Sequence, residues 1–151
     1  MSQDFRDLLS AFLEGKVKFL VVGAYAVAAH STPRATGDLD VWVAPGRENG
    51  GRVYRALARF GAALEGITES DFATEGTVFQ IGVVPRRIDL VTSITGVEFE
   101  RAWPNRVEAK IFQMSVPVIG LDDLIRNKKA VGRHRDLADV EVLERFPREK
   151  R

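Results

Sequence analysis

The chain of 151 residues lacks cysteine, which excludes disulfide bridges, thiolate zinc sites and a cysteine nucleophile. Any metal would therefore be held by oxygen atoms, which favours Mg²⁺ or Mn²⁺. Long apolar runs are also missing. None approaches the roughly 18 residues that span a bilayer, and the first residues lack the pattern of a secretory signal. We therefore expect a cytoplasmic protein with no membrane partner.

An excess of charge of one sign is absent as well. The formal net charge is +1, so no global basic field indicates a nucleic-acid coat, although the local cluster at residues 126–135 could still bind phosphates. With 45% hydrophobic and 28% charged residues, the composition is typical of one compact domain over residues 1–151 with a proper core.

The most informative stretch is residues 37–43, which read Gly-Asp-Leu-Asp-Val-Trp-Val. Successive side chains of a strand point to opposite faces, so Asp38 and Asp40 lie side by side while the alternate apolar residues face the other way. Two carboxylates held together repel each other unless a cation lies between them. The stretch therefore predicts a metal site, with plain salt bridges to arginines as the structural alternative.

A glycine turn precedes this stretch. An apolar strand over residues 17–22 leads into Gly23 and Ala24, which begin a predicted short helix. Glycine at such a turn lets a ligand approach the backbone, and the free N–H groups of a helix start favour an anion such as phosphate. Neither the dinucleotide fingerprint nor the P-loop pattern is present, so an ordinary turn is the alternative. Arg34, in the loop that follows, could pair with a carboxylate or steady a phosphate.

A third carboxylate lies further along the chain. The pattern of residues 77–91 predicts a β-hairpin whose second strand carries Asp89, on the face it shares with Arg87. A lone carboxylate in a strand usually needs a partner. If this strand lies beside the strand of Asp38 and Asp40, three carboxylates converge and form a platform for one or two magnesium ions.

The whole pattern predicts an α/β (α+β) fold, with a mixed β-sheet flanked by helices in a core of about residues 15–118. The C-terminal helices, about residues 120–147, form a helical hairpin that closes one side of the pocket. An apolar stripe along the first of them continues at Lys128, whose stem either snorkels along the core edge or carries its ammonium group into a polar pocket. Residues 106–112 and 113–118 predict edge-like strands.

Three further side chains have ordinary structural interpretations. His30 and His134 are expected at a helix surface or in a turn, and not as catalytic groups. Trp42 shares the carboxylate face of its strand, where it either packs in the ordinary way or forms a wall of the nucleotide pocket. None of the three is assigned a role in the chemistry.

Three segments together carry a family resemblance. Val-Gly-Ala at residues 22–24, Arg-Ala-Thr-Gly-Asp-Leu-Asp-Val at 34–41 and Arg-Ile-Asp-Leu-Val at 87–91 resemble the nucleotidyltransferase superfamily of DNA polymerase beta type. The match covers about residues 17–91. The run at 124–140 is also similar to small bacterial nucleotidyltransferases, including the group related to abortive-infection toxins. The three-part acidic pattern is fairly specific, whereas D-x-D alone is not.

The resemblance implies a function and a metal site. Asp38 and Asp40 would hold Mg²⁺ or Mn²⁺ together with the triphosphate, and Asp89 would complete the site near the acceptor hydroxyl. The implied reaction is metal-dependent transfer of a nucleoside monophosphate from an NTP, such as ATP, to an unidentified acceptor. This acceptor could be tRNA, a protein, an antibiotic or another small molecule.

The resemblance also implies how the nucleotide binds. The turn at Gly23 and Ala24 would cradle phosphates, and Lys128, with Arg34, would neutralise their charge. The second turn residue of the family is usually Gly or Ser, and alanine keeps the backbone N–H but lacks a hydroxyl. A catalytically degenerate nucleotide-binding protein, or one half of a toxin–antitoxin pair with a cognate partner protein, is therefore the alternative.

Overall fold

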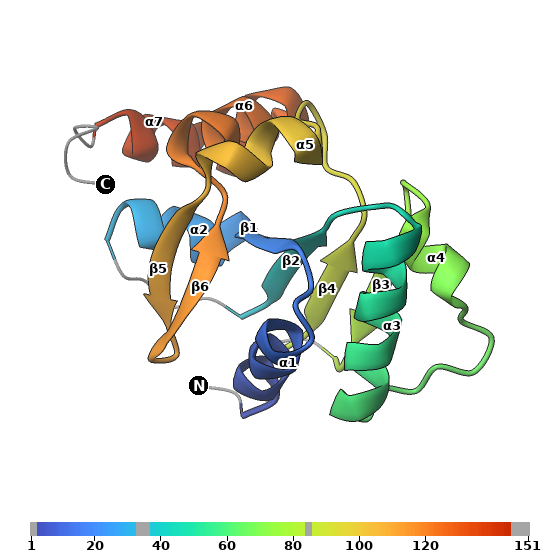
Figure 1. Cartoon of the computed structure of the whole chain (residues 1–151). Helices are drawn as coiled ribbons and strands as arrows, with labels where there is room; N and C mark the ends of the chain where they lie inside the picture. Colours follow the sequence, from blue (N-terminus) through green and yellow to red (C-terminus); the bar gives the residue numbers. More distant parts are fainter. Residues whose placement is uncertain (1–2, 33–36, 84–85, 146–151) are drawn as a thin grey trace.

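A computed structural model describes residues 3–32, 37–83 and 86–145 (Figure 1). The strands are β1 (Phe19–Val22), β2 (Leu39–Val43), β3 (Val78–Ile81), β4 (Ile88–Val91), β5 (Val107–Ile111) and β6 (Met114–Val118). The helices are α1 (Gln3–Glu14), α2 (Gly23–His30), α3 (Arg47–Phe60), α4 (Glu69–Ala73), α5 (Phe99–Ala102), α6 (Leu121–Val131) and α7 (His134–Glu144), with a 3-10 turn at Trp103–Asn105.

The six strands form one mixed sheet in the order β3-β4-β2-β1-β6-β5. Strands that follow one another in the chain pair antiparallel, as β1 with β2, β3 with β4 and β5 with β6. The pairs β2–β4 and β1–β6 are parallel. The structure therefore confirms the predicted mixed sheet, and it places β4 directly beside β2.

The two faces of the sheet are covered by different helices. Figure 1 shows α1 and α3 on one side and α5, α6 and α7 on the other. On the first face, Phe19 lies opposite Val43 and packs against Phe12 of α1. On the second face, Trp42 is 1% exposed and packs edge-on against Phe99, with ring centroids 5.0 Å apart. Trp42 therefore has the ordinary packing role.

The predicted edge character is wrong for one strand. β6 lies inside the sheet, between β5 and β1, whereas β5 is an edge. Ile119 donates its backbone N–H to the carbonyl of Val21 at 3.1 Å, and N–H groups two residues apart in a strand point the same way. The missing N–H of Pro117 therefore faces β1 and cannot extend the ladder towards Phe19, and the pairing of the two strands is confined to Val21 and Val118.

The chain ends in the predicted helical hairpin. α6 and α7 pack against each other and also contact α2. Gly132 lies between them with φ of 73°, a left-handed conformation that ends α6 and lets the chain reverse. The hairpin thereby places one segment of α6 and the start of α7 opposite the sheet.

Within the described residues, no helix combines the length and the apolar character that crossing a membrane requires.

Candidate active site

The sheet register brings the predicted carboxylates together. In the parallel pair of β2 and β4, Asp40 lies directly opposite Asp89. Asp38 immediately precedes β2, and one of its carboxylate oxygens accepts a hydrogen bond from the backbone N–H of Arg87 at 3.1 Å. The two strands are therefore neighbours, which was the condition for the carboxylates to converge. All three carboxylates lie at the same end of the β2–β4 pair.

Gly23 lies against this cluster because β1 pairs with β2. Val22 is opposite Asp40, and the next residue, Gly23, has φ of 68°. A Cβ atom built on Gly23 would collide with the Asp40 carboxylate. Glycine is thus required twice, for its left-handed backbone and for the close approach. No side chain caps the start of α2, so its first N–H groups, at Gly23 and Ala24, face the site without a side-chain acceptor.

Arg87 binds two of the three carboxylates. Its Nε and Nη2 donate to the two oxygens of Asp89 at 2.7 and 3.1 Å, and Nη2 lies 3.3 Å from Oδ2 of Asp38. The sequence places Arg87 on the face of Asp89 but does not by itself assign it to the site. The period of two along the strand was the signal that could have found this pair.

The environment of Asp40 is short of positive charge. Burial is the largest cause of a shift that raises the pKa of Asp40 from 3.8 to about 6, followed by the negative charges of Asp89 and Asp38. Lys128 and Arg87 act in the opposite direction without cancelling the shift. The cluster therefore favours an additional cation, or failing that a proton.

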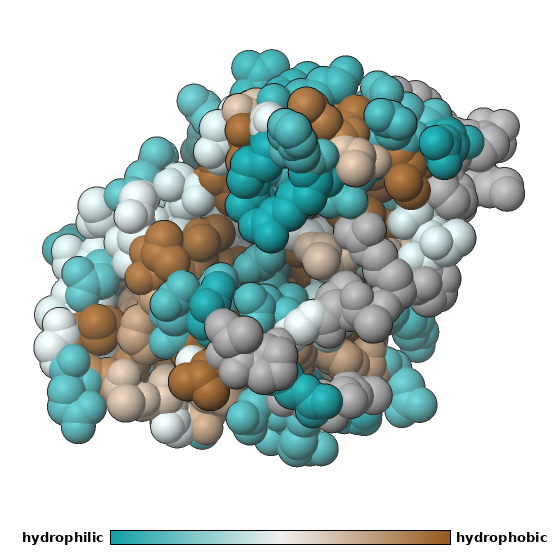
Figure 2. Space-filling model, turned by 180° about the vertical axis from the view of Figure 1, so that it is seen from behind, coloured by the Kyte–Doolittle hydropathy of each residue, from teal (hydrophilic) through white to brown (hydrophobic). Residues whose placement is uncertain are grey.

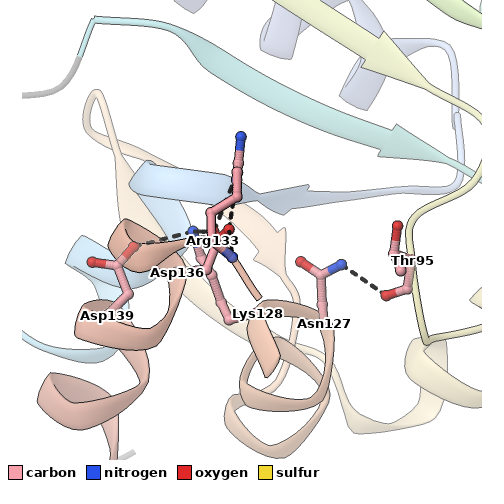
Figure 3. A network of polar contacts seen from close by, with 6 residues as sticks. All are labelled: Thr95, Asn127, Lys128, Arg133, Asp136 and Asp139. Carbon is pink, nitrogen blue, oxygen red and sulfur yellow. Dashed lines mark hydrogen bonds and ion pairs between the residues drawn. The ribbon is translucent and has the colours of Figure 1, made fainter. Parts of the chain in front are cut away.

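Lys128 lies across from the sheet, with its head in a polar pocket. The residue is 8% exposed, and its Nζ lies 3.3 Å from Oδ1 of Asp136 and 3.1 Å from Oδ2 of Asp139 (Figure 3). Of the two interpretations left open for this stripe position, the structure confirms the polar pocket. A role in binding phosphate stays a prediction.

Asp136 is the centre of this second group. Arg133 donates from Nε and Nη2 to its two oxygens at 2.6 and 3.2 Å, and the backbone N–H of Arg133 also donates to it. The Arg133 hydrogen bonds are the largest cause that lowers the pKa of Asp136 from 3.8 to about 2, and Lys128 adds to them. Figure 3 shows Lys128 and Arg133 converging on this carboxylate from α6 and the start of α7.

The two groups face each other across a cleft of about 550 Å³. Figure 2 shows this face hollowed between the C-terminal helices and the sheet, with hydrophilic residues and a hydrophobic patch beside the hollow. The cleft is lined by these predicted site residues: Gly23, Ala24, Asp38, Asp40, Asp89 and Lys128. A larger hollow of about 640 Å³ beside the start of α3 contains none of them. We therefore take the 550 Å³ cleft as the candidate site.

The remaining predictions have mixed outcomes. Arg34 lies outside the described residues. The expectation for His30 is wrong, because its side chain is 5% exposed and its Nε2 donates to the carbonyl of Ile119 at 2.7 Å. The short helix α2 is enclosed by its neighbours, so its last residue is buried. His134 is exposed at the start of α7, as expected.

The donor set suits a divalent metal, although the side chains are not arranged around one. No group of three or more His, Cys, Asp or Glu side chains in the described part of the chain has an arrangement that would hold a metal ion as it stands. The donors themselves are all carboxylate oxygens, which hard cations prefer, and the raised pKa of Asp40 reports excess negative charge. Both oxygens of Asp89 accept a hydrogen bond from Arg87, so a cation at Asp89 would lie beside this guanidinium and be repelled by it.

Comparisons with known proteins identify the fold. No protein-family model matches the chain, and no curated protein matches it in sequence. The lincosamide antibiotic adenylyltransferase LnuA, solved with lincomycin bound, has a TM-score of 0.62 at 14% identity over 95% of this chain and 96% of its own. ANT(2'')-Ia, solved with adenylyl-2''-tobramycin, has a TM-score of 0.57 at 16% identity over 97% of this chain and 89% of its own.

A further similar structure comes from Thermotoga maritima. This nucleotidyltransferase candidate has a TM-score of 0.55 at 13% identity, and the match covers 93% of this chain and 88% of the other. The chain therefore shares the fold of nucleotidyltransferases along nearly its whole length. A shared fold does not by itself carry the chemistry, which has to be argued from the site.

Proposed function

We propose that the protein is a nucleotidyltransferase that moves a nucleoside monophosphate from an NTP to a hydroxyl group of an acceptor, with Mg²⁺ or Mn²⁺. The observation that carries the proposal is the register of β2 and β4, which sets Asp40 beside Asp89 with Asp38 next to them. These carboxylates face Lys128 across the cleft, beside the uncapped start of α2. Anionic ligands for a metal and donors for phosphates thus line one cleft.

Asp38, Asp40 and Asp89 are the residues that would hold the metal. When bound, the cation offsets the charge of the triphosphate and of the leaving pyrophosphate. Because the pKa of Asp40 is raised to about 6, this carboxyl group still binds a proton for part of the time near neutral pH. A cation beside it favours the ionised form, which is the form that binds metal.

The phosphates would lie between the start of α2 and α6. Gly23 and Ala24 contribute backbone N–H groups at a helix N-terminus, where an anion is stabilised. Ala24 retains this N–H, so the missing hydroxyl removes one donor and not the anion site. Lys128 supplies a positive charge from the opposite wall, and we include Arg34 as a further phosphate ligand on the basis of the sequence pattern.

Two observations support a small-molecule acceptor. LnuA is a lincosamide antibiotic adenylyltransferase solved with lincomycin bound, and ANT(2'')-Ia, an antibiotic-resistance factor, was solved with adenylyl-2''-tobramycin. In this chain Val78 and Val131 line the cleft and are 61% and 38% exposed. They offer an apolar surface beside the charged groups, which suits a compact amphipathic molecule. Antibiotics of this kind are the first acceptors to test, before tRNA and protein.

The experiment is a transfer assay with α-labelled NTPs and Mg²⁺ against panels of lincosamides, aminoglycosides, tRNA and protein. We expect label in one panel, and a loss of about 10³-fold or more in Asp40→Asn and Asp89→Asn, the order seen when charge stabilisation is removed. Asp7→Asn is the matched control, because Asp7 is exposed on α1, outside the cleft, and accepts a hydrogen bond from the side chain of Gln3. Absence of transfer in every panel, or full activity of Asp40→Asn, would overturn the proposal.

The alternatives have their own outcomes. A degenerate nucleotide-binding protein would bind NTP and Mg²⁺ in equilibrium dialysis without transferring label to any acceptor. The relationship to abortive-infection toxins, a cognate partner protein, the single-domain organisation and the cytoplasmic location stay predictions from the sequence.

A further inference from the structure

The predicted metal ligands are already bound by a cation of the protein. The guanidinium of Arg87 donates to both oxygens of Asp89, at 2.7 and 3.1 Å, and lies 3.3 Å from the carboxylate of Asp38. Two parallel hydrogen bonds from one guanidinium to one carboxylate form a strong, charge-assisted pair. A metal ion that binds Asp89 would share this carboxylate with the guanidinium and be repelled by its positive charge, so the two cations compete electrostatically.

We propose that Arg87 is a positioning residue that holds Asp89 until a metal–nucleotide complex arrives, and then moves its guanidinium from Asp89 to a phosphate oxygen. This inference rests on the proposed function, because it assumes that the carboxylates bind the metal of an NTP. The same two N–H groups that bind a carboxylate also fit the oxygens of a phosphate. A phosphate of the nucleotide thereby replaces Asp89 as the hydrogen-bond acceptor of Arg87 when the metal binds Asp89.

The backbone of Arg87 allows this exchange to leave the site intact. Its N–H donates to Asp38 at 3.1 Å, and β4 begins at the next residue, Ile88. Asp38 is thus oriented by a main-chain bond that does not depend on the guanidinium. The side chain of Arg87 is 27% exposed, so it has room to move while the strand stays paired.

Two other cations of the cleft are bound to carboxylates of the helical hairpin. Lys128 lies between Asp136 and Asp139, and Arg133 binds both oxygens of Asp136. Among the described residues, neither forms a hydrogen bond or ion pair with the carboxylates of the sheet, and Arg135, which also lines the cleft, is exposed. Arg87 is therefore the group whose position couples metal binding to nucleotide binding, and free metal should bind weakly until a triphosphate is present.

The test is a Mn²⁺ titration followed by electron paramagnetic resonance, with and without a non-hydrolysable NTP analogue. We expect Arg87→Met to bind free Mn²⁺ roughly tenfold more tightly than the wild type, the order of one charge-assisted pair, and to bind Mn²⁺ with the analogue roughly tenfold more weakly. Arg86→Met is the matched control. It removes the same charge one residue away, but Arg86 is exposed and makes no ion pair with the described residues.

Arg87→Lys keeps the charge and loses the two-pronged geometry, so it should retain wild-type affinity for free Mn²⁺ and lose part of the gain from the analogue. Weaker binding of Mn²⁺ by Arg87→Met in both conditions would show a purely structural role and overturn the inference. Unchanged binding in both conditions would overturn it as well. Failure of the wild type and of Arg87→Met to bind Mn²⁺ in either condition would instead overturn the proposed function. Thermal unfolding of each variant confirms that it is folded.

Discussion

The two walls of the cleft treat the same side chain in opposite ways. On the sheet wall, burial and the neighbouring Asp89 and Asp38 raise the pKa of Asp40 to about 6. On the helical wall, the hydrogen bonds of Arg133, followed by Lys128, lower the pKa of Asp136 to about 2, although this side chain is 1% exposed. Burial is thus not decisive, because the number of cations within reach determines the direction of the shift.

This difference separates two tasks. The helical wall balances two carboxylates with two cations, so it is complete without a ligand and contributes to stability. The sheet wall sets three carboxylates against the guanidinium of Arg87 and the charge of Lys128, so its negative charge is not balanced. Under the proposed function, another cation would balance it. The contrast predicts that substitutions on the two walls change stability in opposite directions.

The largest expected change is in Asp136→Asn. The amide cannot balance Lys128 and Arg133, so the buried lysine loses one of its two carboxylate partners and the free energy of unfolding should fall by about 3 kcal/mol at pH 7. Urea unfolding measures this loss. Asp7→Asn on the surface of α1 is the control and should change stability by less than about 0.5 kcal/mol.

The same variant has a defined pH dependence. The folded-state pKa of Asp136, about 2, lies below the ordinary 3.8, so its stabilisation is fully present above about pH 4 and is lost as the pH falls towards 2. The difference in the free energy of unfolding between wild type and Asp136→Asn should therefore become smaller as the pH falls from about 4 towards 2. A difference that stays constant down to pH 2 would show that ionisation of Asp136 does not cause the loss of stability.

A smaller change of opposite sign is expected in Asp40→Asn without metal. The folded-state pKa of Asp40 is raised, so ionisation of this carboxyl group destabilises the folded state. The penalty is absent below pH 3.8 and is fully present above about pH 6. Asparagine removes this penalty, which is at most about 3 kcal/mol for the whole shift. Because Asp40 is partly exposed and solvent screens its charge, the variant should be more stable by about 2 kcal/mol at pH 8. Thermal unfolding at pH 8 and at pH 4 measures the difference. A loss of stability at pH 8 would contradict the charge imbalance of the sheet wall.

The smallest change is expected in Lys129→Met. Lys129 pairs with Glu144 at 3.4 Å, but the two side chains are 57% and 52% exposed, and such surface pairs contribute little. The free energy of unfolding should change by less than about 0.5 kcal/mol. Its neighbour gives the comparison, because Lys128→Met leaves Asp136 and Asp139 short of a buried cation. Equal effects of the two substitutions in urea unfolding would show that burial of Lys128 is unimportant.

Much of the sheet wall could be predicted from the sequence. The period of two set Asp38 and Asp40 on one face, and the hairpin pattern put Asp89 in a strand. The sequence did not show that β2 and β4 are neighbours, because their pairing depends on contacts between distant segments of the chain. The structure supplies this pairing. The apolar stripe of α6 likewise predicted an inward Lys128, but not which carboxylates it meets.

The missed residues were missed for a common reason. Arg87 and Arg133 both look like ordinary surface arginines, because sequence shows neither the direction of a long side chain nor its partner. Local spacing held a signal in each case: Arg87 is two residues from Asp89 on a strand, and Arg133 is three residues from Asp136 at a helix start. The burial of His30 had no such local signal, since it depends on how α2 meets the residue that follows β6.

The close approach of Gly23 to Asp40 has a consequence for anyone sorting or engineering chains of this fold. Any side chain at this position would push the carboxylate out of its place, whereas Ala24 already carries a methyl group without such a conflict. In a saturation library, position 23 should accept glycine alone among variants selected for activity, while position 24 should accept several small residues. We therefore predict that a relative that keeps both strands but has another residue than glycine at position 23 lacks the proposed activity.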